Sequence, residues 1–207
     1  MPSPTTLVFD IGNVLIGWDP RNLYGKVFDD PERMEWFLAE VCHNAWNLEQ
    51  DRGRLFAEAV AERTAAFPQL EAEIRAYDER WPEMISGPIE GSVKLLEALR
   101  GRGDRVYAIT NFSHEKFAVA QDLFPFLRGF DGIVVSGDER VIKPDPAIYR
   151  LLLGRYALQP QDCVFVDDSR ANVEGALAVG MQGIHFTSPE AMIRDLQALG
   201  FPVPEVL

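Results

Sequence analysis

Two continuous apolar runs that end in aspartate constrain the fold of this chain more than any other feature. The first spans Leu7–Asp10 and the second spans Val164–Asp168. Unbroken apolar runs of this length are typical of central strands in a parallel sheet, where helices cover both faces. Because such sheets place ligands beyond the carboxyl ends of their strands, we expect the acidic residues of both runs at one edge.

Strands and helices are predicted to alternate after residue 88. We expect strands at residues 105–110, 132–136, 163–167 and 183–186, and helices at 90–100, 113–123, 147–156, 171–179 and 188–200. This alternation indicates a doubly wound parallel sheet of the α/β class. Residues 1–17 and 88–207 are therefore predicted to form an α/β core.

Residues 18–87 separate the first strand from the rest of the core. Apolar residues recur at helical spacing over 32–41, 53–66 and 70–81, and Pro31, Pro68 and Pro82 punctuate the segment. A segment of this length is too long for a loop inside a compact domain. We therefore expect a helical cap, inserted after the first strand, over the carboxyl edge of the sheet.

The composition excludes several classes of protein. The hydrophobic content of 47% indicates a globular chain, and the formal net charge of −12 argues against nucleic acids or anionic membranes as partners. No apolar run reaches the length of roughly 18 residues that a membrane span needs, and the first residues lack the pattern of a signal peptide. Cys42 and Cys163 are expected to be buried thiols in a reducing cytoplasm. We expect a cytoplasmic monomer or homodimer that acts on a small molecule.

Chemically active side chains follow the predicted strands. They are Asp10 after the first strand, Thr110 and Asn111 after the second, Lys143 after the third, and Asp167 and Asp168 after the fourth. Carboxylates gathered at one edge raise each other's pKa unless a cation lies among them. Oxygen ligands without clustered Cys or His are typical of Mg²⁺ sites. A carboxylate nucleophile, cationic groups and hydrogen-bond donors are the parts that phosphoryl transfer requires.

With these residues in this order, the chain resembles the haloacid dehalogenase superfamily of hydrolases over nearly its whole length. The resemblance implies that Asp10 attacks the substrate and forms an aspartyl intermediate, and that Thr110 and Lys143 hold the transferred group. The segment Phe9–Val14 is similar to the Phe-Asp-x-Gly-Asn-Val motif of a sugar-phosphatase-like subgroup. The helical insertion is similar to the first class of cap in this superfamily.

The resemblance also implies the ligands of the metal and of the phosphate. Asp10, the backbone carbonyl of Gly12, and Asp167 or Asp168 are expected to hold Mg²⁺. Either member of the Asp167–Asp168 pair can be the direct ligand. Asn111 and Asn13 are expected to bind the phosphate, and Asn13 tolerates the left-handed conformation better than most residues.

One position departs from the superfamily's phosphatases, which usually carry a second aspartate where this chain has Gly12. A missing general acid–base typically costs about 10²- to 10⁴-fold in rate. The substrate can have a good leaving group, such as a sugar 1-phosphate or an acyl phosphate. Alternatively, a cap residue takes over, with Asp19 and His43 as the candidates. A third explanation is dehalogenation, in which the halide leaves without a proton.

The alternatives to a phosphatase are a metal-independent 2-haloacid dehalogenase and a non-catalytic binder of a phosphate ligand. The Asp167–Asp168 pair favours the metal-dependent phosphatase, because the fourth motif of the dehalogenases is usually rich in serine.

Arg21 and Arg52 are the cap cations that we expect near an anionic substrate. Other candidates for the lining of a cap pocket are Trp18, Trp46 and Asn47.

Overall fold

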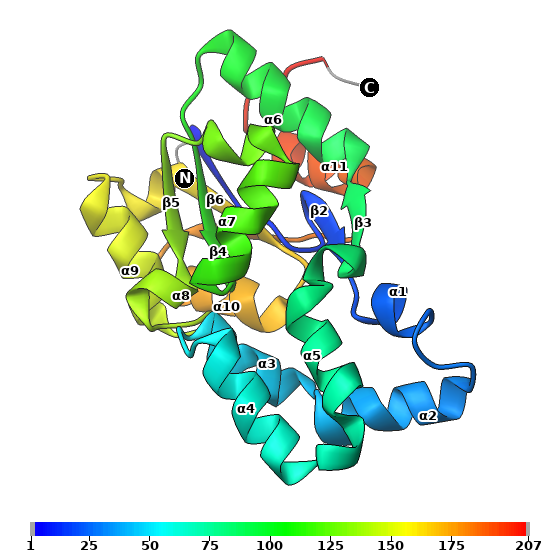
Figure 1. Cartoon of the computed structure of the whole chain (residues 1–207). Coiled ribbons are helices and arrows are strands. Elements are labelled where there is room, and N and C mark those ends of the chain that lie inside the picture. Colours follow the sequence, from blue (N-terminus) through cyan, green and yellow to red (C-terminus); the bar gives the residue numbers. More distant parts are fainter. Residues whose placement is uncertain (1–2, 206–207) are drawn as a thin grey trace.

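A computed structural model, which describes residues 3–205, contains a five-stranded parallel sheet with the order β5-β4-β1-β6-β7 (Figure 1). The strands are β1 (Thr6–Phe9), β4 (Val106–Thr110), β5 (Gly132–Val135), β6 (Cys163–Asp167) and β7 (Gln182–His185). β1 lies in the middle, between β4 and β6. The predicted α/β fold is confirmed, and the two aspartate-ended runs are adjacent central strands.

Helices cover both faces of the sheet. They are α6 (Glu90–Arg102), α7 (His114–Leu123), α8 (Ser136–Glu139), α9 (Pro146–Arg155), α10 (Arg170–Ala178) and α11 (Pro189–Ala198). Alternate residues of β1 point to opposite faces, because Leu7 and Phe9 belong to one hydrophobic cluster and Val8 belongs to the other. The doubly wound arrangement thus buries the central strands completely.

Helices also fill the segment between β1 and α6 and lie beyond the carboxyl ends of the strands (Figure 1). They are α1 (Arg21–Tyr24), α2 (Pro31–Trp36), α3 (Asn44–Asp51), α4 (Phe56–Ala66) and α5 (Glu71–Glu79), together with a π-helical turn at Phe37–Val41. A two-stranded antiparallel ribbon of β2 (Ile16–Trp18) and β3 (Ile85–Pro88) joins this segment to the core. The predicted first and last residues of the cap, 18 and 87, both fall within this ribbon. The division of the chain into core and cap stays a prediction.

The cap differs from the sequence expectation in one functionally important place. Helix α3 was not predicted, because its apolar residues are too few to reveal the helical period. His43 caps its first turn, with Nδ1 accepting a hydrogen bond of 3.1 Å from the backbone N–H of Trp46. The predicted helix 53–66 begins instead at Phe56, because a turn with Gly53 at φ +103° precedes it.

Two simpler expectations can be compared directly with the structure. Cys42 and Cys163 are both buried and free, as predicted. Across residues 3–205, no helix has the length and apolar character needed to cross a bilayer.

Candidate active site

Lys143 lies between two carboxylates at the carboxyl edge of the sheet. Its Nζ is 2.8 Å from Oδ1 of Asp10 and 2.6 Å from Oδ2 of Asp167. It also donates a hydrogen bond of 3.2 Å to the carbonyl oxygen of Ile109. All three charged side chains are almost fully buried, which makes their pairing mandatory. Burial alone would lower the pKa of Lys143, but the two carboxylates outweigh it and raise this pKa, so the ammonium form is held.

Negative charge exceeds positive charge in this cluster. Carboxylate oxygens of Asp10, Asp167 and Asp168 all lie within 4.8 Å of one another. Burial raises the pKa of Asp10 to about 8; the Lys143 ammonium opposes this shift and the Asp167 carboxylate adds to it. Burial and Asp167 also raise the pKa of Asp168. One ammonium cannot balance three carboxylates, and a divalent cation with oxygen ligands fits both the charge and the donor set.

The two aspartates after β6 have different surroundings. Asp167 is completely buried, and its Oδ1 accepts hydrogen bonds from the Ser169 backbone N–H at 2.8 Å and from Asn172 Nδ2 at 3.0 Å. The residue Asp168 is exposed. Asp167 therefore already accepts hydrogen bonds from an ammonium, a side-chain amide and a backbone N–H. The carboxylate oxygens of Asp168 have fewer partners and are more available to bind a metal.

Thr110 and Asn111 follow β4, next to β1. Within residues 3–205 the Oγ1 atom of Thr110 is buried and has no hydrogen-bond partner. An unpaired buried hydroxyl is costly, which is typical of a group kept for a ligand. Asn111 instead exchanges two hydrogen bonds with the backbone of Lys143, at 2.8 and 3.1 Å. Its amide holds the lysine loop in place, a role that the phosphate-binding prediction did not include.

The loop after β1 turns sharply at Asn13, which has φ 56°, in the left-handed region that asparagine tolerates. The Asn13 Oδ1 accepts a hydrogen bond of 2.9 Å from the backbone N–H of Trp18, and the nearby Asn13 side chain partly offsets the rise in the pKa of Asp168. A Cβ atom built on Gly12 would meet nothing within 4 Å. The structure therefore has room for a side chain at position 12, and steric crowding does not explain the glycine there.

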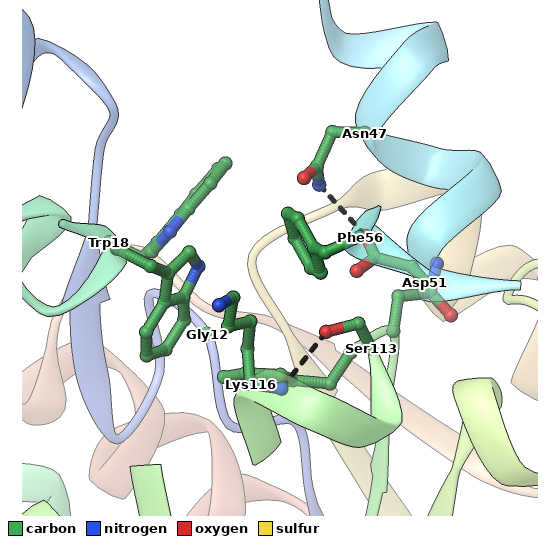
Figure 2. A pocket seen from close by; sticks show the side chains of 10 residues that line it. Gly12, Trp18, Asn47, Asp51, Phe56, Ser113 and Lys116 are labelled. Carbon is green, nitrogen blue, oxygen red and sulfur yellow. Dashed lines mark hydrogen bonds between the residues drawn. The ribbon is translucent and has the colours of Figure 1, made fainter. Parts of the chain in front are cut away.

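A pocket lies where the cap meets the sheet edge. Gly12 lines it together with four aromatic side chains, Trp18, Phe56, Trp81 and Phe112. Figure 2 shows the labelled residues Trp18 and Phe56 facing each other across it, with Gly12 at its base. The expectation that Trp18 lines a cap pocket is confirmed, while Trp46 is buried in the core instead.

Most polar side chains of the pocket are already engaged. Asn47 donates a hydrogen bond of 3.0 Å to Asp51 Oδ2, and its Oδ1 accepts one of 3.1 Å from the Tyr77 hydroxyl. Lys116 donates to the backbone carbonyl of Asp78 at 3.0 Å and pairs with the carboxylate of the same residue. The pocket therefore offers an incoming molecule aromatic surface more than hydrogen-bonding groups.

Asp19, Arg21, His43 and Arg52, the cap residues expected near the substrate, lie outside the lining of this pocket. Asp19 accepts from the backbone N–H of Arg21 at 2.9 Å, and the Arg21 guanidinium pairs with Glu35 at 2.6 Å. His43 caps α3, and Arg52 is exposed, 3.7 Å from Glu49. Their role in binding stays a prediction.

The pocket contains a carboxylate that the sequence pattern did not single out. Asp51, the last residue of α3, lines it together with Gly12 and Asn111. Burial raises the pKa of Asp51 to about 7, although the Ser113 backbone N–H and the Lys143 charge lower it. No local motif marks this aspartate, because only the folding of the cap onto the sheet brings it to the site.

Comparison with known proteins gives relatives with named activities. The chain is 28% identical to the sesquiterpene phosphatase astK of Aspergillus oryzae over 192 residues, covering 93% of this chain and 94% of that protein. It is 29% identical to the chloroplast flavin mononucleotide hydrolase 1 of Arabidopsis thaliana over 115 residues. That second match covers 56% of this chain and less than half, 46%, of the plant protein.

Comparison with solved structures shows that other proteins share this fold. A crystal structure of a HAD family enzyme from Bacteroides thetaiotaomicron, in complex with magnesium and inorganic phosphate, superposes with a TM-score of 0.69 at 22% identity. The match covers 89% of this chain and 95% of the other, and shows a common fold. The sequence profile of the haloacid dehalogenase-like hydrolases matches residues 4–180. With its nucleophile motif, lysine and paired aspartates within that range, this chain belongs to the haloacid dehalogenase-like hydrolases.

Proposed function

We propose that this hydrolase is a Mg²⁺-dependent phosphatase of a small phosphorylated metabolite and works through an aspartyl-phosphate on Asp10. The observation that carries the proposal is the charge imbalance at the sheet edge, where one buried ammonium faces three clustered carboxylates. The phosphatase relative that covers most of the chain supports the same reaction class. A cytoplasmic location and a monomeric or homodimeric state belong to the same proposal.

The residues of the chain divide the work of phosphoryl transfer. Asp10 attacks phosphorus, and its carboxylate is oriented by the backbone N–H of Ile11, which donates to Oδ1 at 2.7 Å. The unpaired Thr110 hydroxyl donates to a phosphoryl oxygen, and Lys143 offsets the charge that this oxygen gains. Water then attacks the aspartyl-phosphate and regenerates Asp10.

The proposed metal site uses Asp10, the carbonyl of Gly12, and Asp167 or Asp168. When bound, Mg²⁺ supplies charge that offsets the phosphoryl oxygens and the carboxylates alike. Asp168 is the better candidate for the direct protein ligand, because Asp167 already accepts hydrogen bonds from Lys143, Ser169 and Asn172.

The pocket lining supports a leaving group with aromatic or aliphatic surface. A sugar phosphate, which the sequence allowed, would meet few free polar groups there, since Asn47 and Lys116 are engaged within the protein. Aromatic walls instead favour partners that bury apolar area. The relatives named for a sesquiterpene phosphatase and a flavin mononucleotide hydrolase support this direction.

The test is phosphate release from a panel that contains p-nitrophenyl phosphate, an isoprenyl monophosphate and two sugar phosphates. Each substrate is assayed with Mg²⁺ and with chelator, and Asp10→Asn serves as the matched inactive variant. We expect Mg²⁺-dependent turnover that Asp10→Asn abolishes, with the isoprenyl or aromatic ester preferred. Chelator-resistant halide release from 2-haloacids would establish the dehalogenase instead. Metal-dependent phosphate binding without turnover would establish the binder.

A further inference from the structure

The cap supplies a carboxylate to the site from which the superfamily's usual acid–base is missing. Resting on the function proposed above, we propose that Asp51 is the general acid–base of this phosphatase. Its carboxyl group protonates the leaving oxygen of the ester, and its carboxylate later accepts a proton from the attacking water. Asp51 thereby replaces the aspartate that Gly12 lacks, in place of Asp19 or His43.

The first argument is position. Asp51 and Gly12 line the same pocket, next to Asn111 at the end of β4. Figure 2 shows Asp51 and Asn47 reaching into it from α3. Asn47 donates to Oδ2 of Asp51 at 3.0 Å and is itself held by the Tyr77 hydroxyl at 3.1 Å, so the carboxyl group is oriented by a fixed donor.

The second argument is that the backbone of Asp51 is anchored directly to the core. The Ser136 hydroxyl donates to the backbone carbonyl of Asp51 at 2.5 Å. Two residues later, a Cβ on Gly53 would lie 2.8 Å from the carbonyl oxygen of Gly137. This close backbone approach of the α3–α4 turn to α8 sets the distance between the Asp51 carboxyl group and the sheet edge.

The third argument is the protonation state. Burial raises the pKa of Asp51 to about 7, and the Ser113 N–H and the Lys143 charge oppose it. Other charged or titratable residues on the neighbouring elements are Arg52 after α3, Tyr77 and Asp78 on α5, His114, Glu115 and Lys116 on α7, and Asp138, Glu139 and Arg140 at α8. Several of these side chains form ion pairs: His114 pairs with Asp138, Lys116 with Asp78, and Glu139 with Arg155 of α9. An acid–base with a pKa near the working pH populates both of its required forms.

The proton balance closes over the two half-reactions. In the first, the bond from Asp10 Oδ to phosphorus forms, the ester P–O bond breaks, and the Asp51 proton passes to the leaving oxygen. In the second, water attacks phosphorus and gives one proton to the Asp51 carboxylate. The bond from phosphorus to Asp10 then breaks, so Asp10 is again ionised and Asp51 is again protonated.

The test compares two aromatic esters that differ in their need for a proton. p-Nitrophenyl phosphate releases a stabilised phenolate, whereas 2-phenylethyl phosphate releases an alkoxide that must be protonated. We expect Asp51→Asn to lower kcat/KM for the phenylethyl ester by about 10²- to 10⁴-fold and for the nitrophenyl ester by less than about tenfold. Because hydrolysis of the aspartyl-phosphate also needs Asp51, the variant should show a burst of one nitrophenolate per active site.

The matched control is Glu49→Gln, which removes one exposed carboxylate from the same helix and should leave both kcat/KM values unchanged. An equal loss on both esters, or no loss on either, in folded Asp51→Asn protein would overturn the proposal. If wild-type protein released no phosphate, or Asp10→Asn stayed active, the phosphatase itself would be refuted, whatever Asp51 does.

Two further measurements test the proposal, and the first of them needs only wild-type protein, so it still applies if Asp51→Asn fails to fold. In wild-type protein, kcat/KM for the phenylethyl ester should fall above neutral pH while that for the nitrophenyl ester does not; parallel profiles would count against Asp51. In addition, Gly12→Asp should restore phenylethyl ester turnover to stable Asp51→Asn protein, because a Cβ at position 12 has open space. A folded, Mg²⁺-binding double variant without this gain would also count against the proposal.

Discussion

Asp10→Asn should make the metal-free protein more stable at neutral pH while it abolishes turnover. The nucleophile is only 7% exposed, and with Lys143 and Asp167 it forms a buried group with one excess negative charge. The hydrogen bonds from Ile11 and Lys143 both end on Oδ1 of Asp10, and the carbonyl oxygen of asparagine can accept both. At pH 7 the buried carboxyl avoids this excess charge by holding a proton, since burial raises its pKa to about 8, and taking up that proton on folding costs free energy. Asparagine keeps the contacts without that cost, while Lys143 keeps Asp167 as its ion-pair partner.

The direction of this change in stability follows from proton linkage. Folding raises the pKa of Asp10 from 3.8 to about 8, so between these pH values the folded state binds more protons than the unfolded state. The free energy of unfolding contributed by Asp10 must then fall as the pH rises through this window. One pKa unit corresponds to about 1.4 kcal/mol, so the roughly three units between pH 4 and 7 set an upper bound of about 4 kcal/mol. Because the charged cluster can relax, we expect Asp10→Asn to raise the free energy of unfolding by about 1–3 kcal/mol at pH 7, which is less than this bound.

The assay is thermal unfolding by calorimetry in chelator at pH 4, 5.5, 7 and 8. At pH 7 the Tm of Asp10→Asn should exceed that of wild type by about 2–12 °C, from roughly 2–4 °C per kcal/mol for a chain of this size. This difference in Tm should disappear towards pH 4. Mg²⁺ should also reduce the difference, because the metal stabilises wild type more than the variant. Asp29→Asn, at an exposed aspartate, is the control and should stay within about 0.5 kcal/mol of wild type. An unchanged or lower Tm at pH 7, or a gap independent of pH, would refute the reasoning.

Two further predictions concern the same edge of the sheet. Lys143→Ala should lower the free energy of unfolding in chelator by about 3 kcal/mol, because it leaves Asp10 and Asp167 buried without their cation; an unchanged urea midpoint would contradict this. Gly53→Ala should cost about 1–3 kcal/mol in the same assay, since φ is +103° and the new Cβ would approach the Gly137 carbonyl oxygen to 2.8 Å. The same variant should reduce activity on the phenylethyl ester more than on the nitrophenyl ester, because the turn that holds Asp51 must shift; equal losses on the two would argue against that coupling.

Much of the core and its charged cluster was predictable from local sequence. Continuous apolar runs ending at Asp10 and Asp167 are readable because a central parallel strand must be apolar on both faces. The carboxyl ends of such strands meet at one edge, so Asp10, Thr110 and Asp167 could be expected together there, whereas Lys143 reaches them from the loop after α8. The excess negative charge, and hence the case for a cation, follows from those residue types alone.

The cap was predictable only as a helical insertion. Helix α3 has too few apolar residues for a clear period, and its first turn depends on a histidine cap that pattern analysis does not anticipate. Asn111 likewise exchanges hydrogen bonds with the Lys143 backbone 32 positions away, which no local pattern indicates, and its expected role in phosphate binding stays a prediction.

The α/β class, the succession of strands and helices in the core, and the members of the charged cluster could be read from the sequence, because strand burial and strand ends are local properties. The fold of the cap onto the core was needed to bring the Asp51 carboxylate into the pocket that Gly12 lines and to surround this pocket with aromatic rings. These features come from packing α3 and its Gly53 turn against α8, a contact between segments 84 residues apart at Gly53 and Gly137. No local pattern encodes such a contact, since it arises from the shapes of two surfaces that meet only after the chain has folded.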